Sequence, residues 1–213
     1  MEHENHDDNA ETILHTAVRE NKLDLVKILL NDGAKVSAQN KQGDTPLHIA
    51  AQNGSLEIVT LLLAKGADPT LVDFADGYTP LHWAAFNGHS DVVDLLIQLP
   101  IDLNAVEPHD KLTALHLAAI NGNTEVVEML IHAPKVDINA CNAYGNTPLH
   151  LAAGGGFVGV VDVLSRAKDI QINARNQEQM TPLQLAALEG ESEVVRILIN
   201  HPDIEMELDD QDA

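Results

Sequence analysis

The sequence predicts an all-α repeat fold, a solenoid of six helix-turn-helix repeats linked by β-hairpin loops. Three observations predict it: a phrase beginning with threonine recurs six times, an aliphatic phrase follows each copy, and glycine or asparagine separates the two. Successive threonines lie 33, 34, 34, 34 and 34 residues apart, at Thr12, Thr45, Thr79, Thr113, Thr147 and Thr181. This constant period indicates that each copy is one structural unit stacked on its neighbours.

The threonine phrase predicts the first helix of each repeat. It is TPLH in three copies, and TILH, TALH and TPLQ in the others. Threonine is a good N-cap, proline is a good first helical residue, and the alanines that follow allow close packing. A column of residues then predicts a left-handed end to this helix, at Asn21, Gly54, Gly88, Gly122, Gly156 and Gly190.

The aliphatic phrase predicts the second helix, because its apolar residues at i, i+1, i+4 and i+5 form one buried stripe. Its six copies begin at Leu25, Ile58, Val92, Val126, Val160 and Val194. Polar turns separate the repeats, as in NKQGD from Asn40 and NAYGN from Asn142. Such turns are typical of the tips of projecting hairpins.

Together, T-P-L-H, A-A, the turn glycine and V-V-x-x-L resemble the ankyrin repeat, over roughly residues 10 to 205. The resemblance implies antiparallel helix pairs stacked into a curved solenoid. It also implies a concave face lined by hairpin tips and inner helices, and a function in protein recognition.

The repeats set the expected domain boundaries. We expect an acidic tail over residues 1–9 and an ankyrin repeat domain over 10–202, with repeats at about 10–40, 41–73, 74–107, 108–142, 143–176 and 177–202. Residues 203–213 are either an acidic tail or a partial hairpin of a seventh repeat, because DIEMELDD from Asp203 resembles DIQINARN from Asp169. Either this acidic end acts as a cap or residues beyond 213 are missing.

Composition excludes several classes of partner. Acidic residues outnumber basic ones 33 to 12, and the formal charge of −21 disfavours nucleic acid and anionic lipid surfaces. No segment approaches the roughly 18 apolar residues of a membrane helix. Cys141 is the only cysteine, which fits a reducing compartment, so we expect a cytoplasmic protein.

One stretch raises a nucleotide-binding alternative. LAAGGGFVGVVDVL carries Gly154, Gly156 and Gly159 in the G-x-G-x-x-G spacing of dinucleotide-binding loops. That interpretation needs a preceding strand, whereas the alignment places these glycines in a helix-to-helix turn. We therefore expect no nucleotide and no other cofactor. Gly159 also takes a place that is acidic in the other repeats, at Asp24, Glu57, Asp91, Glu125 and Glu193.

The histidines raise a metal-site alternative. Five of the eleven belong to the repeated phrase, at His15, His48, His82, His116 and His150. They recur one repeat apart and cannot converge on one ion, so we expect a structural role and no metal. In ankyrin proteins this imidazole typically bonds to the threonine hydroxyl and to neighbouring backbone. His3 and His6 leave open a weak metal site in the N-terminal tail.

The sequence carries no recognisable catalytic motif, and we expect a non-enzymatic module that binds a protein or peptide on its concave face. Its contact residues should be those that the scaffold does not need, at the hairpin tips and just before the turn glycine. These positions are Asp44, Asn53, Asp76, Tyr78, Phe86, Asn87, Asp110, Leu112, Ile120, Asn121, Tyr144, Met180 and Leu188.

Four of the six aromatic residues cluster within thirteen positions, at Phe74, Tyr78, Trp83 and Phe86. Exposed aromatic residues dominate interface energetics, so Tyr78 and Phe86 are the main contact candidates. We interpret Trp83 as a core residue. The surrounding carboxylates favour a partner with a basic rim, and we expect the protein to be a monomer.

Three alternatives remain. They are a regulatory or targeting segment of a larger protein, a host-directed bacterial effector acting in the host cytosol, and a nuclear protein. Asn104 also ends LIQLPIDLN, which resembles the pattern hydroxylated by an asparaginyl hydroxylase in other ankyrin domains, and Asn139 ends a weaker match. Asparagine is routine in such hairpins, which is the simpler interpretation.

The fifth repeat should be the least stable. Glycine within a helix costs about 0.5–1 kcal/mol relative to alanine, and Ser165 replaces an aliphatic residue. We expect amide hydrogen exchange to open residues 147–176 before residues 45–131. Equal protection of the two segments would contradict this expectation.

Overall fold

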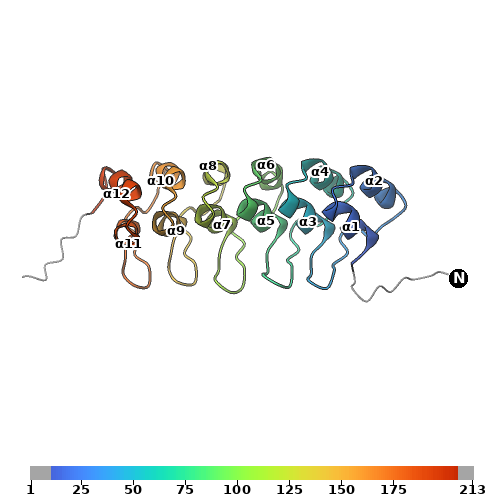
Figure 1. The fold of residues 1–213 in the computed structure, drawn as a ribbon, viewed down its shortest axis with the longest axis horizontal. Helices are drawn as coiled ribbons and strands as arrows, with labels where there is room; N and C mark the ends of the chain where they lie inside the picture. Colours follow the sequence, from blue (N-terminus) through green and yellow to red (C-terminus); the bar gives the residue numbers. More distant parts are fainter. Residues whose placement is uncertain (1–10, 206–213) are drawn as a thin grey trace, which may run out of the picture. The chain divides into compact units, whose positions relative to one another are not determined.

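A computed structural model describes residues 11–205, which group into two compact units, residues 11–109 and residues 110–205. The described residues form twelve helices, and none of them is assigned to a strand. Each unit is a series of three antiparallel helix pairs (Figure 1). The all-helical repeat fold predicted from the sequence is therefore confirmed. The described residues do not include residues 1–10, which contain His3 and His6, or residues 206–213.

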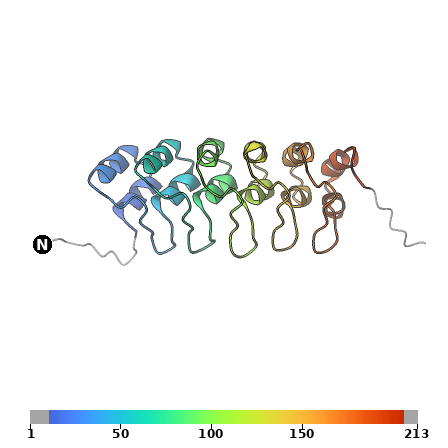
Figure 2. The ribbon, with the colours of Figure 1, turned by 180° about the vertical axis from the view of Figure 1, so that it is seen from behind.

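The first unit contains α1 (Ile13–Arg19), α2 (Leu23–Asn31), α3 (Pro46–Asn53), α4 (Leu56–Ala64), α5 (Pro80–Asn87) and α6 (Ser90–Ile97). Helix α3 packs between α1 and α5 to form an inner row, and α4 packs between α2 and α6 to form an outer row. The two rows are seen from opposite sides in Figures 1 and 2. Between them lies an aliphatic core with fully buried residues such as Leu47, Ile58 and Leu62.

The second unit repeats the arrangement. It contains α7 (Ala114–Ile120), α8 (Thr124–His132), α9 (Pro148–Gly154), α10 (Val158–Ser165), α11 (Pro182–Glu189) and α12 (Ser192–Ile199). Helix α9 packs between α7 and α11, and α10 packs between α8 and α12. Buried alanines such as Ala118 and Ala152 let the inner helices approach closely.

Threonine begins every inner helix with a reciprocal cap. In α3 the Thr45 hydroxyl accepts a hydrogen bond from the backbone N–H of His48, and the His48 Nδ1 accepts one from the backbone N–H of Thr45 at 3.1 Å. The same capping box occurs at all six inner helices. Gln184 replaces histidine in α11, where its Oε1 accepts the bond from Thr181. The predicted N-caps are therefore confirmed.

The second nitrogen of each imidazole ties its helix to the next loop. The Nε2 of His48 lies 3.0 Å from the carbonyl oxygen of Tyr78, and the Nε2 of His116 lies 3.1 Å from that of Asn146. Because Nδ1 accepts the threonine N–H, the proton resides on Nε2, which donates to the carbonyl. These bonds confirm the structural role expected for the repeated histidines.

The predicted left-handed positions are also confirmed. Asn21 and the five turn glycines have φ between 52° and 81°. At three of the glycines the following repeat fills the space of the missing side chain. A Cβ on Gly54 would lie 2.5 Å from the His89 ring, and one on Gly122 would lie 2.6 Å from the Phe157 ring.

The glycine-rich stretch is a helix-to-helix turn, as the alignment predicted. Gly154 ends α9, Gly156 is left-handed, and Gly159 lies in the first turns of α10. A Cβ on Gly159 would lie 2.8 Å from the Thr124 hydroxyl of the preceding repeat. The structure thus gives Gly159 a packing reason that the sequence did not reveal, because glycine lets α10 approach α8 closely.

The loops are tighter than the predicted hairpins. Each of four loops closes with one backbone bond from the first tip residue to the residue before threonine, as between Asn40 N and Asp44 O at 2.9 Å. This pairing is too short to be assigned as a strand within residues 11–205. Residues 203–205 continue the pattern, because the side chain of Asn173 bonds to Asp203 and Glu205 as that of Asn139 bonds to Asp169 and Gln171.

The close approach at some turn glycines predicts that alanine lowers the unfolding free energy by different amounts at two left-handed positions. Gly190→Ala should cost about 1 kcal/mol of unfolding free energy, because nothing lies within 4 Å of the new Cβ and only backbone strain is added. Gly122→Ala should cost roughly 2–4 kcal/mol, because the new Cβ also collides with Phe157. Urea titration of both variants measures the difference, and equal losses would argue against the packing role.

The buried imidazoles predict acid sensitivity. Burial lowers the pKa of His116 to about 4 and also lowers the pKa values of His15, His48 and His150. The unfolded chain, with an imidazole pKa near 6.5, takes up a proton first. The stabilisation is therefore complete above about pH 6.5 and is lost as the pH falls towards 4.

His116→Gln should remove part of this sensitivity, because glutamine serves in the same place in the sixth repeat. Between pH 7 and pH 5 the wild type should lose about 2 kcal/mol more unfolding free energy than the variant. Urea titrations at a series of pH values compare the two slopes. Parallel slopes would show that His116 does not titrate differently in the folded and unfolded states.

Candidate partner-binding surface

A buried polar residue holds each loop tip, and sequence reasoning missed this column. In three tips it is an asparagine whose side-chain oxygen accepts two backbone N–H groups, as Asn40 does from Gln42 and Asp44. Asn142 and Asn176 do the same. The only signal in the sequence is a polar residue five or six positions before each threonine.

Two tips of the first unit use a carboxylate in this column, Asp73 and Glu107, and both side chains are buried. The Asp73 Oδ1 accepts the backbone N–H groups of Asp76 and Gly77 at 2.8 and 3.0 Å. Backbone bonds also join neighbouring tips, including Phe74 N to Gln42 O at 2.7 Å. The tips are therefore held in one conformation by the scaffold.

Trp83 corrects one sequence interpretation. It was expected in the core, but its ring is only half-buried, on the surface of α5. Its indole N–H donates to the Oδ2 of Asp73 at 2.8 Å. An indole needs a partner for its N–H when it is buried, and the carboxylate beneath the tip supplies one while fixing the ring orientation.

Three aromatic side chains of the first unit form a connected cluster. Trp83 meets Tyr78 edge-on with ring centroids 5.1 Å apart, and it meets Phe86 edge-on at 6.0 Å. Phe86 is 38% exposed, and Phe74 on the adjacent tip is 67% exposed. The sequence-predicted contact candidates Tyr78 and Phe86 thus flank a residue that the sequence assigned to the core.

Carboxylates surround this cluster. Desolvation, followed by the charges of Asp73, Glu107 and Asp44, raises the pKa of the exposed Asp76, and only His109 opposes them. The ion pairs recorded within residues 11–109 bring no lysine or arginine to Asp44, Asp73 or Asp76. The aromatic cluster therefore lies among carboxylates, and His109 is the one charge that opposes them at Asp76.

In the second unit the predicted contact residues are mainly aliphatic. Ile120 and Leu188 are 42% and 68% exposed and occupy the same column as Phe86. The repeat between them has Gly154 in this column, and the side chain of Leu185 lies against this glycine. Tyr144 is exposed, and its hydroxyl donates to Asp110, which raises the pKa of the Tyr144 phenol.

Some predicted contact residues also serve the scaffold. The amides of Asn87 and Asn121 donate to carbonyls one turn earlier in their own helices, those of Trp83 and Leu117. Asp44 accepts a bond from Asn40, and the amide of Asn53 reaches the carbonyl of Arg19 in the preceding repeat. Leu112 and Met180 are partly covered. Among the aromatic and aliphatic candidates, the exposed ones are Phe86, Ile120, Tyr144 and Leu188.

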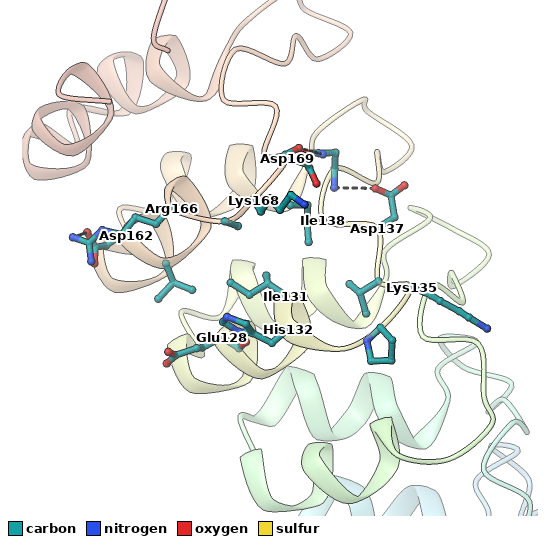
Figure 3. Close-up of a pocket in the computed structure, with 15 residues that line it drawn as sticks. Glu128, Ile131, His132, Lys135, Asp137, Ile138, Asp162, Arg166, Lys168 and Asp169 are labelled. Carbon is teal, nitrogen blue, oxygen red and sulfur yellow. Dashed lines mark hydrogen bonds and ion pairs between the residues drawn. The ribbon is translucent and has the colours of Figure 1, made fainter. Parts of the chain in front are cut away.

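A groove of about 1030 Å³ in the second unit lies between the outer helices α8 and α10 (Figure 3). Charges of both signs line it, and Arg166 pairs with Asp162 at 2.6 Å. Aliphatic residues such as Ile131 and Ile138 lie among these charges, and the groove has no single-sign field that would select a ligand class.

Other chemistry is sparse in the described part of the chain. No group of three or more histidine, cysteine or acidic side chains between residues 11 and 205 is placed to hold a metal ion. Cys141 is exposed, and its sulfur lies near the carbonyl of Asn139. No helix of the described residues is long and apolar enough to cross a membrane.

Comparison with protein families agrees with the geometry. The family described as ankyrin repeats in three copies matches residues 1–73, 70–142 and 115–212. The chain belongs to the ankyrin repeat family. Ankyrin repeats are generally protein–protein interaction modules and are typically non-enzymatic. A search of the curated proteins found no match to the chain.

In this ankyrin repeat protein, some columns of residues hold the scaffold together and others remain at the surface. The threonine, histidine and glycine columns are occupied by internal bonds and close packing. In the next variable column, Phe86, Ile120 and Leu188 stay exposed. Exposed apolar side chains on a rigid support are typical of recognition surfaces.

Proposed function

We propose that this ankyrin repeat protein binds a protein or peptide through the tips and inner helices of its units, without catalysing a reaction. The observation that carries the proposal is the exposure of Phe86, Ile120 and Leu188 in one column of otherwise self-satisfied repeats. Tips held by buried polar residues lose little conformational freedom on binding, which favours affinity.

The charge distribution supports a partner with a basic rim. The chain carries a formal charge of −21, and the aromatic cluster of the first unit lies among Asp44, Asp73, Asp76 and Glu107. Such a field accelerates association with a cationic partner and makes the rate sensitive to salt. The same charge disfavours self-association, which supports a monomer. A cytoplasmic location is supported by the single exposed cysteine.

Asn104 is a second candidate, as a site of modification rather than binding. Its backbone N–H donates to the side chain of Asp102 in the loop after α6. The equivalent Asn139 uses both amide atoms to bridge to the next loop, at Asp169 and Gln171. That bridging explains the asparagine at position 139 without hydroxylation, and partner binding remains the leading proposal.

A peptide display library panned on the whole chain tests the proposal. We expect enriched peptides to lose more than ~2 kcal/mol of binding free energy against the Tyr78→Ala, Phe86→Ala double variant or against Ile120→Ala, Leu188→Ala. The matched control is Ile28→Ala, which removes an exposed aliphatic residue from the outer helix α2. Unchanged binding to both double variants, with intact helical content, would refute the proposed surface.

A further inference from the structure

We propose that the surface formed by Trp83, Phe86 and Asp76 in the first unit binds an arginine side chain of the partner. This inference rests on the proposed function and names the chemistry that the surface recognises. The partner is a peptide segment or loop that presents a guanidinium group to an aromatic cluster among carboxylates.

The ring arrangement suits a planar cation. Trp83 and Phe86 lie three residues apart on α5, so they share one face of the helix, and their rings meet at 77°. Trp83 meets Tyr78 at 64°, again edge to face. In edge-on packing the edge of one ring contacts the face of its neighbour, so the three rings do not cover one another as a parallel stack would. Trp83 is half-buried and Phe86 is exposed, so parts of both rings face solvent.

The buried carboxylate strengthens the indole as a cation acceptor. Asp73 is 2% exposed, accepts two backbone N–H groups through one oxygen and accepts the Trp83 N–H at 2.8 Å through the other. Donation to an anion polarises the indole and makes its face more negative. The same bond fixes the ring, so little side-chain entropy is lost on binding.

The carboxylates around the aromatic cluster favour a positively charged group from the partner. Asp44, Asp73 and Asp76 have no lysine or arginine partner among the ion pairs of residues 11–109. Asp76 is exposed on the same tip as Asp73, whose carboxylate accepts both the Asp76 backbone N–H and the indole N–H. In the proposal the Asp76 carboxylate pairs with the guanidinium that stacks on the rings. Desolvation and, after it, the charge of Asp73 raise the pKa of Asp76, and a guanidinium beside it would favour its charged form.

Arginine fits better than the other candidate occupants. Its guanidinium is planar, stacks on aromatic faces and is more weakly hydrated than the lysine ammonium. A purely apolar peptide would leave the carboxylates uncompensated. A second copy of this chain also has a formal charge of −21, so electrostatic repulsion disfavours its binding to this surface.

The single tryptophan makes a direct test available. Trp83 is the only tryptophan, so the chain gives one indole N–H signal in a ¹H–¹⁵N spectrum. The probes are three peptides, Ac-Gly-Ser-Xaa-Ser-Gly-NH₂, in which Xaa is arginine, lysine or citrulline. Citrulline keeps the planar shape of arginine and removes its charge.

We expect the arginine peptide to shift the indole signal saturably at millimolar concentrations. The lysine peptide should bind about threefold more weakly, and the citrulline peptide at least about tenfold more weakly. Phe86→Ala and Asp76→Asn, which keep the indole reporter, should each weaken arginine binding at least about threefold. Tyr144→Ala is the matched control, because it removes an exposed aromatic residue beside Asp110 in the second unit, and it should leave the affinity unchanged.

Two results would overturn the inference: no saturable shift with the arginine peptide, or equal shifts with arginine and citrulline. Thermal melts of each variant show whether a loss of binding reflects unfolding. If the arginine peptide fails while display peptides still depend on Phe86, the proposed function stands and only the arginine site falls. If display yields no surface-dependent peptide while arginine binds at Trp83, the proposed function falls and the cation site remains.

Discussion

Each neutral imidazole of the T-x-L-H phrase joins three parts of the molecule. Its Nδ1 closes the N-terminal cap of one inner helix, while its Nε2 donates to a backbone carbonyl of the following loop, as His48 does to Tyr78. Helix start, helix packing and loop position are therefore coupled at a single buried side chain. Protonation would place a second N–H against the threonine amide and break this coupling. The rest of each unit depends on the ring remaining neutral.

Because the scaffold satisfies its own polar groups in this way, the remaining columns are free to vary. The column two positions before the turn glycine contains Gln52, Phe86, Ile120, Gly154 and Leu188 in repeats two to six. None of these side chains caps a helix or fills the core. Chemical diversity on a constant backbone is what allows one repeat architecture to recognise different partners.

The aromatic cluster of the first unit is joined to a buried tip carboxylate by the bond from Trp83 to Asp73. The tips that contain Asp73 and Glu107 have one more residue before threonine than the tips that contain asparagine. A carboxylate in the tip column can accept two backbone N–H groups and still receive the Trp83 indole. A residue that stabilises the tip therefore also orients an aromatic ring and supplies negative charge beside it.

The sequence by itself determined the helix pairs, their caps and the left-handed turns, because these depend on interactions within a few residues and the 34-residue period repeats them. It also located Phe86, which is exposed, and Tyr78, which is half-buried, as contact candidates. Only the tertiary structure decided the place of Trp83, the role of Asp73 and the reason for Gly159. Each of these depends on a contact between different elements: Trp83 with Asp73 in the preceding tip, and Gly159 with Thr124 in the preceding repeat. A one-dimensional pattern does not encode such distances, because the same residue types suit either a core or a surface until their neighbours are in place.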